Sequence, residues 1–199
     1  MKRRDVLETL ARYRGMSPAV VGPGFGGRIL HEIDHQPATI YNMEFGYPVA
    51  VCLGLALALP QERVFAVEGD GSLIAALGTL TTVARYAPRN LIILAIDNRS
   101  FATTGAQPTA SASATDIAAV GRAAGLVSSM CVADMAAVET ALARAVESDG
   151  PHLIVAEVEH EDVRSAGRSK AYPFDIVEAA ITFRRSLENR GLVPTIWAV

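Results

Sequence analysis

Residues 69–72 read Gly-Asp-Gly-Ser and separate an apolar strand pattern from a helical one. Gly69 and Gly71 let the backbone come close to a ligand, and the helix that begins at Ser72 offers free N–H groups to an anion. Asp70 lies between the glycines, where its carboxylate would repel a bare phosphate. A divalent cation between the two removes this conflict, because Mg²⁺ is commonly held by one or two carboxylates together with phosphate oxygens. Taken alone, Gly-Asp-Gly is also typical of an ordinary tight turn.

Asn98 favours the metal interpretation over the tight turn. It directly follows the apolar strand pattern of residues 90–97, which is the next strand pattern after Asp70. A strand–helix–strand unit of this length returns the chain to the same edge of a parallel sheet, so the two side chains are expected side by side. The amide oxygen of Asn98 is then available as a second metal ligand. The pair predicts a site for a metal ion and a diphosphate.

The elements that must position these residues follow from the apolar patterns. Helices are predicted over residues 4–14, in a short segment ending before Pro37, and over 47–59, 72–85, 116–124, 134–147 and about 174–190. Strands are predicted over residues 19–21, 38–41, 63–68, 90–97 and 152–158. Continuous apolar strands that alternate with helices indicate an α/β fold, a doubly wound parallel sheet with helices on both faces.

Residues 98–115 form a long predicted loop rich in Ser, Thr, Ala and Gly. Loops of this length in a compact domain are usually functional. Ligands of doubly wound sheets bind at the carboxyl ends of the strands, so this loop and the turn at 69–72 should converge. We expect one binding domain over residues 1–160. Residues 161–199 form a more polar tail with one helix, either part of that domain or a subunit contact.

Composition narrows the function classes. The net charge is −3, which gives no electrostatic reason to expect nucleic acid or an anionic membrane as a partner. Cys52 and Cys131 are far apart, which argues against a disulfide scaffold or an iron–sulfur cluster. The longest apolar run, 49–59, is too short to span a bilayer, and the first residues are too charged for a signal peptide. A cytoplasmic protein is expected.

The Gly-Asp-Gly turn and the later Asn98 resemble the motif of thiamine-diphosphate-dependent enzymes, in their diphosphate-binding domain. The resemblance implies thiamine diphosphate and Mg²⁺ as cofactors, with Asp70, the Asn98 side chain and the Ser100 backbone carbonyl as metal ligands. In the segment "MEFGYPVAVCLGLAL" it implies that Phe45 wedges the cofactor into its bent shape and that the carbonyl of Met43 accepts from the aminopyrimidine. The implied cofactor-binding set is Gly24, Met43, Phe45, Gly46, Gly69, Asp70, Gly71, Ser72, Asn98, Ser100 and Phe101.

Within this family the sequence is most similar to the sulfopyruvate decarboxylase beta subunit and to phosphonopyruvate decarboxylase, above all over residues 69–109. Three departures concern the substrate rather than the cofactor. Phe45 stands where these enzymes usually have Met, and Glu44 where they have a small residue. Their diphosphate loop contains Ser or Thr, whereas residues 22–27 read "GPGFGG". Only Gly24 therefore carries over from that loop.

The resemblance also implies a missing part. The glutamate that activates the cofactor comes from a second domain of similar fold in this family, and a chain of 199 residues has room for one such domain. The predicted function is therefore the cofactor-binding subunit of a heteromeric 2-oxo acid decarboxylase, a lyase. Its catalytic Glu would come from a pyrimidine-binding partner subunit, in a heterotetramer or larger assembly. A carboligase subunit like that of acetolactate synthase is the alternative.

Residues 31–35, "HEIDH", match a different motif. On a helix, HExxH places two His ligands on Zn²⁺ with the Glu, here Glu32, as general base. This would make the chain a zinc hydrolase. The context is unfavourable, because the predicted helix is short and a zinc hydrolase of this type is not built on a parallel sheet.

Overall fold

The computed structural model describes residues 1–160 and 175–195. Six parallel strands form one sheet in the order β2-β1-β3-β4-β8-β7. The strands are β1 (Ala19–Val21), β2 (Thr39–Ile40), β3 (Val64–Gly69), β4 (Leu91–Asp97), β7 (Ser128–Val132) and β8 (His152–Glu157). The helices are α1 (Arg3–Arg14), α2 (Phe25–Ile33), α3 (Pro48–Ala58), α4 (Asp70–Ala75), α5 (Thr79–Tyr86), α6 (Ile117–Ala124), α7 (Met135–Glu147) and α8 (Ile176–Asn189).

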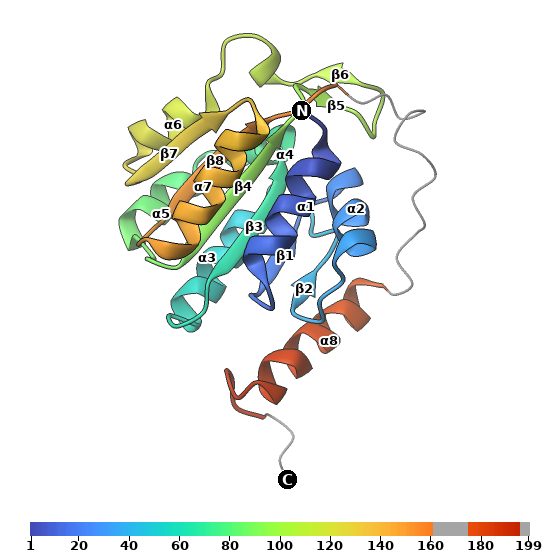
Figure 1. Cartoon of the computed structure of the whole chain (residues 1–199), viewed down its shortest axis with the longest axis vertical. Coiled ribbons are helices and arrows are strands. Elements are labelled where there is room, and N and C mark those ends of the chain that lie inside the picture. The colour runs from blue at the N-terminus through green and yellow to red at the C-terminus, as the bar shows by residue number, and fades with distance from the viewer. Residues whose placement is uncertain (161–174, 196–199) are drawn as a thin grey trace.

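Two hydrophobic cores lie on opposite faces of this sheet. One joins α1, α2 and α7 to strand residues such as Phe65 and Val67. The other joins α3, α4, α5 and α6 to the alternate strand residues Val64 and Ala66. Every residue of β4 is buried, because helices cover both of its faces. The predicted doubly wound α/β fold is confirmed (Figure 1).

The structure differs from the predicted elements in two places. The single helix expected over 72–85 is divided into α4 and α5, and its i−4 hydrogen bonds give way to i−3 bonds at the break, including Ala76 N–H to the Leu73 carbonyl. Strand β7 was missed altogether. It is an edge strand whose residues Ser128 to Cys131 are only partly buried or exposed, so it lacks the continuous apolar run by which the inner strands were recognised.

The long loop after β4 contains its own short elements. Strands β5 (Ser100–Phe101) and β6 (Gln107–Pro108) pair as an antiparallel ribbon, and a 3₁₀ turn, η1 (Ala110–Ala112), follows. In Figure 1 this ribbon, the start of α4 and the N-terminus lie together at the top, beyond the carboxyl ends of the strands. The loop predicted to be functional therefore covers the edge of the sheet where ligands of such folds bind.

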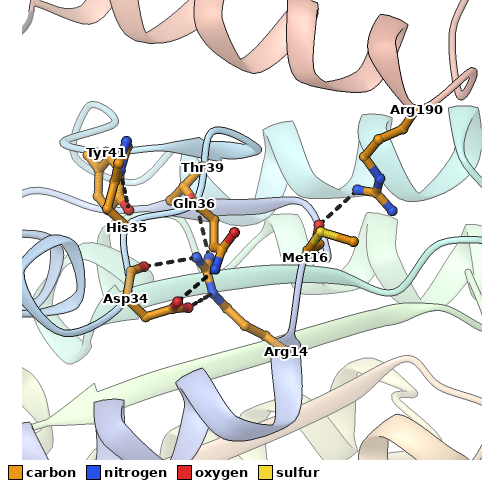
Figure 2. A network of polar contacts seen from close by, with 8 residues as sticks. All are labelled: Arg14, Met16, Asp34, His35, Gln36, Thr39, Tyr41 and Arg190. Atoms are coloured by element: carbon orange, nitrogen blue, oxygen red, sulfur yellow. Dashed lines mark hydrogen bonds and ion pairs between the residues drawn. The ribbon is translucent and has the colours of Figure 1, made fainter.

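Helix α8 lies at the other end of the molecule, beside β2 (Figure 1). Phe183 and Leu187 pack against Ala38 and Leu59 in a small third core. The Arg190 guanidinium donates to the carbonyl of Met16 at 2.8 Å (Figure 2). The helix predicted near 174–190 is confirmed, while the rest of the predicted tail, 161–174 and 196–199, lies outside the described residues.

A buried ion pair secures the edge of the sheet near α8 (Figure 2). The side chain of Arg14 is fully buried, and its Nε lies 3.0 Å from Oδ2 of Asp34. Its other nitrogens donate to the Thr39 hydroxyl at 2.9 Å and to the Asp34 carbonyl at 3.2 Å, while Gln36 donates to Oδ1 of Asp34. We call Arg14, Asp34, Gln36 and Thr39 the arginine cluster. It ties the end of α1 to the end of α2 and the start of β2.

No helix in residues 1–160 and 175–195 combines the length and apolar character needed to cross a membrane.

Candidate functional site

A cavity of about 450 Å³ opens at the carboxyl ends of β1, β3 and β4. Its walls come from the Gly-rich loop after β1, the turn after β3, the segment after β4, the loop before α3 and the first residue of α1. The lining residues are Arg3, 22–26, Glu44, Phe45, 67–72, Ile96, Asn98 and 100–104. The turn at 69–72 and the loop after Asn98 therefore converge as predicted.

Asp70 is the first residue of α4 and is 2 % exposed. The neighbouring position 71 requires glycine for steric reasons, since a Cβ atom there would collide with the ring of Phe101. At Gly69, by contrast, no atom lies within 4 Å of the position a Cβ would occupy, which leaves room for a ligand. The two glycines thus serve different purposes, one for close packing and one for open space.

Three oxygen atoms meet beside Asp70. Oδ1 of Asn98 occupies a position 2.8 Å from the Ser100 carbonyl oxygen and 3.1 Å from Oδ1 of Asp70. Three acceptors at such distances repel one another unless a cation lies between them or the amide turns its nitrogen inward. Neighbouring ligands of an octahedral Mg²⁺ are about 2.9 Å apart, because each lies about 2.0–2.1 Å from the ion. These oxygens fit Mg²⁺ in both number and spacing.

The orientation of the Asn98 amide depends on that cation. With the amide oxygen and nitrogen exchanged, the nitrogen would donate to the Ser100 carbonyl and to Asp70, and the oxygen would accept from Nη2 of Arg3 at 3.1 Å. A bound cation favours the orientation with the oxygen inward. The backbone also favours this orientation, because the Ser100 N–H donates to Oδ1 of Asn98 at 3.3 Å.

Two hydroxyls hold the other oxygen of Asp70. Oδ2 accepts from the Thr109 hydroxyl at 2.5 Å and from the Ser111 hydroxyl at 3.0 Å. Ser111 also lies within hydrogen-bond distance of Oδ1 of Asp97, at 2.8 Å. Burial raises the pKa of Asp70, and the nearby Asp97 raises it further, while the Thr109 hydrogen bond lowers it. The hydroxyls therefore favour the ionised carboxylate and leave its Oδ1 directed toward Asn98.

Glu68 lines the cavity and is 3 % exposed. Its Oε2 accepts from the Ser72 hydroxyl at 2.6 Å, and that hydroxyl accepts from the Gly46 N–H at 2.9 Å. Burial raises the pKa of Glu68 to about 7. The Ser72 side chain therefore connects the metal turn to the loop before α3.

The loop before α3 contains the other residues implied by the family resemblance. Phe45 lies at the cavity wall, 46 % exposed, with its ring 6.2 Å from that of Phe101. Gly24 also lines the cavity, with a φ of 101°. Met43 and Gly46 do not line the cavity. The Met43 N–H donates to the Val21 carbonyl at 2.9 Å, which attaches this loop to β1.

Sequence reasoning missed three polar residues of this site. Arg3 extends from the start of α1 into the cavity, where its guanidinium lies 5.8 Å from the centre of the Phe25 ring. Thr109 and Ser111 hold Asp70. Proline and small residues surround these two hydroxyls in the sequence, so no spacing rule selects them. Arg3 stands among other charged residues of an ordinary amphipathic helix, so the sequence does not distinguish it from a surface residue.

The HExxH alternative gains no support. Helix α2 ends at Ile33, so His35 lies beyond the helix and the motif does not present two His on one helical face. The His31 and His35 rings instead lie 4.7 Å apart, and His35 is 3.3 Å from the Tyr41 hydroxyl. Over the described ranges, no three His, Cys, Asp or Glu side chains are grouped to hold a metal.

Comparison with known proteins places the chain in a family. Residues 31–156 match the thiamine pyrophosphate enzyme, C-terminal TPP binding domain, and the chain belongs to this family. It is 37 % identical over 176 residues to "Phosphonopyruvate decarboxylase" of Streptomyces hygroscopicus, covering 87 % of this chain and 43 % of that protein. It is 28 % identical to "Sulfopyruvate decarboxylase subunit beta" of Methanococcus maripaludis, covering 79 % of this chain and 84 % of that subunit.

The solved structures agree on the fold. Benzoylformate decarboxylase from Polynucleobacter necessarius superposes with a TM-score of 0.68 at 21 % identity, covering 78 % of this chain and 33 % of that one. The chain therefore corresponds to one part of that longer protein, and it spans less than half of the phosphonopyruvate decarboxylase it matches. The predicted family resemblance and fold are both confirmed.

Proposed function

We propose that this chain binds thiamine diphosphate with Mg²⁺ as the cofactor-binding part of a 2-oxo acid decarboxylase. The observation that carries the proposal is the meeting of three acceptor oxygens, from Asp70, Asn98 and Ser100, in a cavity whose size suits a cofactor. Family membership identifies the cofactor, and the names of the relatives favour decarboxylation.

Each site residue has a proposed task. Asp70, the Asn98 amide oxygen and the Ser100 carbonyl hold Mg²⁺, and Thr109 fixes the rotamer of Asp70. Open space at Gly69 admits the diphosphate beside the metal. Further proposed contacts with the cofactor come from Gly24, Met43, Phe45, Gly46, Gly71, Ser72 and Phe101. When bound, thiamine diphosphate supplies the electron sink that decarboxylation of a 2-oxo acid requires.

The activating glutamate is proposed to come from a partner subunit with a pyrimidine-binding domain. Glu44 and Glu68 both line the cavity, but they belong to the same domain as the metal turn. Glu68 lies next to that turn and is hydrogen-bonded to Ser72, which places it at the metal end of the cavity. The relatives named subunit beta support an assembly of unlike subunits. The proposed assembly is a heterotetramer or larger.

Reconstitution tests this proposal. The purified chain should bind thiamine diphosphate only with Mg²⁺ and show little or no release of CO₂ from sulfopyruvate or phosphonopyruvate. Mixing it with a pyrimidine-binding subunit from the same genome should restore turnover. Rapid thiamine-dependent turnover by the chain alone, shown by mass spectrometry to be free of partner, would refute the divided site. Condensation of two oxo acids without net release of the aldehyde would favour the carboligase alternative.

A further inference from the structure

The charges around the cavity are poorly matched to an anionic ligand. Three carboxylates line it, those of Glu44, Glu68 and Asp70, whereas Arg3 is the single Lys or Arg among the described lining residues. A diphosphate would add further negative charge. One Mg²⁺ offsets part of this charge, so the position of the remaining positive group matters for binding.

The loop on which Arg3 packs contributes no side-chain donor. Residues 22–26 read Gly-Pro-Gly-Phe-Gly, so this wall offers the ligand neither a hydroxyl nor a basic group. The Arg3 guanidinium lies over the ring of Phe25, which belongs to this wall. A donor from α1 therefore occupies the region where the loop itself has none.

Arg3 is also held close to the metal ligands. It is 7 % exposed, and its Nη2 lies 3.1 Å from the outer atom of the Asn98 amide. When the amide oxygen faces the cation, that outer atom is the nitrogen. Two donors then stand side by side, and a single ligand oxygen beside them would accept from both. A diphosphate bound to the cation would supply an oxygen of this kind.

We propose that Arg3 is a diphosphate-binding residue, which together with the Asn98 amide nitrogen binds an oxygen of the cofactor's diphosphate. This inference rests on the proposed function and extends it to a residue on α1. An arginine suits the task because its planar guanidinium presents several donors and forms charge-assisted hydrogen bonds with phosphate.

The test uses the full chain and inorganic pyrophosphate as the probe. Affinity is measured by calorimetry in saturating Mg²⁺ for wild type, Arg3→Gln and Arg3→Lys. Arg4→Gln is the matched control, because Arg4 is exposed and pairs with Glu32 on the surface. Arg3→Gln should weaken pyrophosphate and thiamine diphosphate binding by about 10- to 100-fold, Arg3→Lys by less, and Arg4→Gln should bind as wild type does.

Binding of Mn²⁺ alone separates ligand contact from a purely structural role. If Arg3 binds the diphosphate, its removal takes a positive charge away from the metal site, so Mn²⁺ affinity should stay the same or rise. If Arg3 only holds Asn98 in place, Mn²⁺ affinity should fall together with pyrophosphate affinity, and the inference is overturned.

Two further outcomes are distinguishable. Wild-type pyrophosphate affinity in Arg3→Gln would overturn the role of Arg3 and leave the proposed function intact. Absence of Mg²⁺-dependent binding in the wild type would overturn the proposed function itself. If Arg3→Gln does not fold, as judged by circular dichroism, Arg3→Met keeps much of the packing against Phe25 and must show the same loss of affinity.

Discussion

The arginine cluster and the three-oxygen site are both buried and polar, yet they are completed in different ways. At the arginine cluster, near the amino ends of β1 and β2, each guanidinium nitrogen of Arg14 faces an acceptor of Asp34 or Thr39. At the carboxyl ends of β3 and β4, the oxygens of Asp70, Asn98 and Ser100 face one another. The chain itself completes the first cluster, whereas the second, with the Asn98 oxygen directed inward, is complete only with the cation that we propose to bind there.

Whether the chain itself satisfies a buried polar group distinguishes a structural cluster from a binding cluster, and the degree of burial does not. Asp70 and Arg14 are equally inaccessible, at 2 % and 1 % exposure. Burying charges is favourable only when partners satisfy them, and breaking a satisfied pair is costly. Substitutions in the two clusters should therefore affect stability and binding in opposite ways.

The largest effect is expected for Asp70→Asn. Removing the only carboxylate of the three-oxygen site should weaken Mg²⁺-dependent thiamine diphosphate binding by at least about 100-fold, since even residues that only orient metal ligands account for about 10- to 100-fold. The same variant should unfold at the same or a higher temperature without ligand, because the substitution removes a buried charge that is also repelled by Asp97. Calorimetry and thermal denaturation measure the two quantities, with the exposed Asp149→Asn as control. Unchanged affinity would refute the metal assignment.

Arg14→Ala should give the reverse pattern. Loss of the buried guanidinium removes the donors that Arg14 provides to Asp34 and Thr39, and the free energy of unfolding should fall by about 3 kcal/mol. Cofactor affinity of the folded fraction should not change. Urea denaturation provides the measurement. Arg12→Ala is the control, because its ion pair with Glu139 is exposed and should contribute about 1 kcal/mol or less. A similar small loss in both variants would contradict the distinction.

Thr109→Val tests whether Asp70 needs a hydrogen-bond partner to bind the metal. Val keeps the shape of Thr but removes the hydroxyl that fixes Oδ2 of Asp70. Metal and cofactor affinity should fall by about 10- to 100-fold, as for other residues that orient metal ligands. Thr140→Val, at an exposed hydroxyl on α7, should have no effect on binding. Equal affinities for both variants in calorimetry would show that Asp70 needs no orienting partner.

The smallest expected effect is the pH dependence of stability that arises from two histidines beside the arginine cluster. Burial lowers the pKa of His35, and Arg14 lowers it further, while Asp34 acts in the opposite sense. The pKa of the neighbouring His31 is also lowered, by burial and by His35. The unfolded chain therefore binds protons more readily, so stability is complete above about pH 6.5 and declines as the pH falls through the lowered pKa values. In His35→Gln, unfolding monitored between pH 5 and about 7 should show a shallower decline; a steeper one would reverse the assignment.

The sheet and the turn at residues 69–72 could be predicted because their signals are local and strong. Strands β3 and β4 are continuous apolar runs, and each ends near a polar residue that the parallel topology brings to one edge. Strand β7 could not be found in this way, because an edge strand is covered on fewer sides and needs no apolar run. The break between α4 and α5 was equally hidden, since the residues around it favour a helix and the tertiary packing interrupts it.

The convergence of Asp70 and Asn98 could be predicted from the sequence, whereas the residues that contact them could not. Asp70 and Asn98 were found from chemistry and spacing. Arg3 and Thr109 lie far from Asp70 in the chain, one before it and one after it, in segments with no pattern that connects them to a metal. Such residues reach a site through the topology of the fold, and their roles emerge only when hydrogen bonds are known. Met43 and Gly46 differ again, because the family resemblance selected them but they do not line the cavity.

The contact between Arg190 and Met16 joins positions that are 174 residues apart in the chain. Closing so long a loop lowers the conformational entropy of the chain before the contact forms. We therefore expect interactions of this kind to form late on a folding pathway. We therefore expect the docking of α8 to follow assembly of the sheet. Interactions made after the folding transition state chiefly slow unfolding. The C-terminal helix would then determine how long a folded molecule persists, while the rate of folding depends on the strands and helices that precede it.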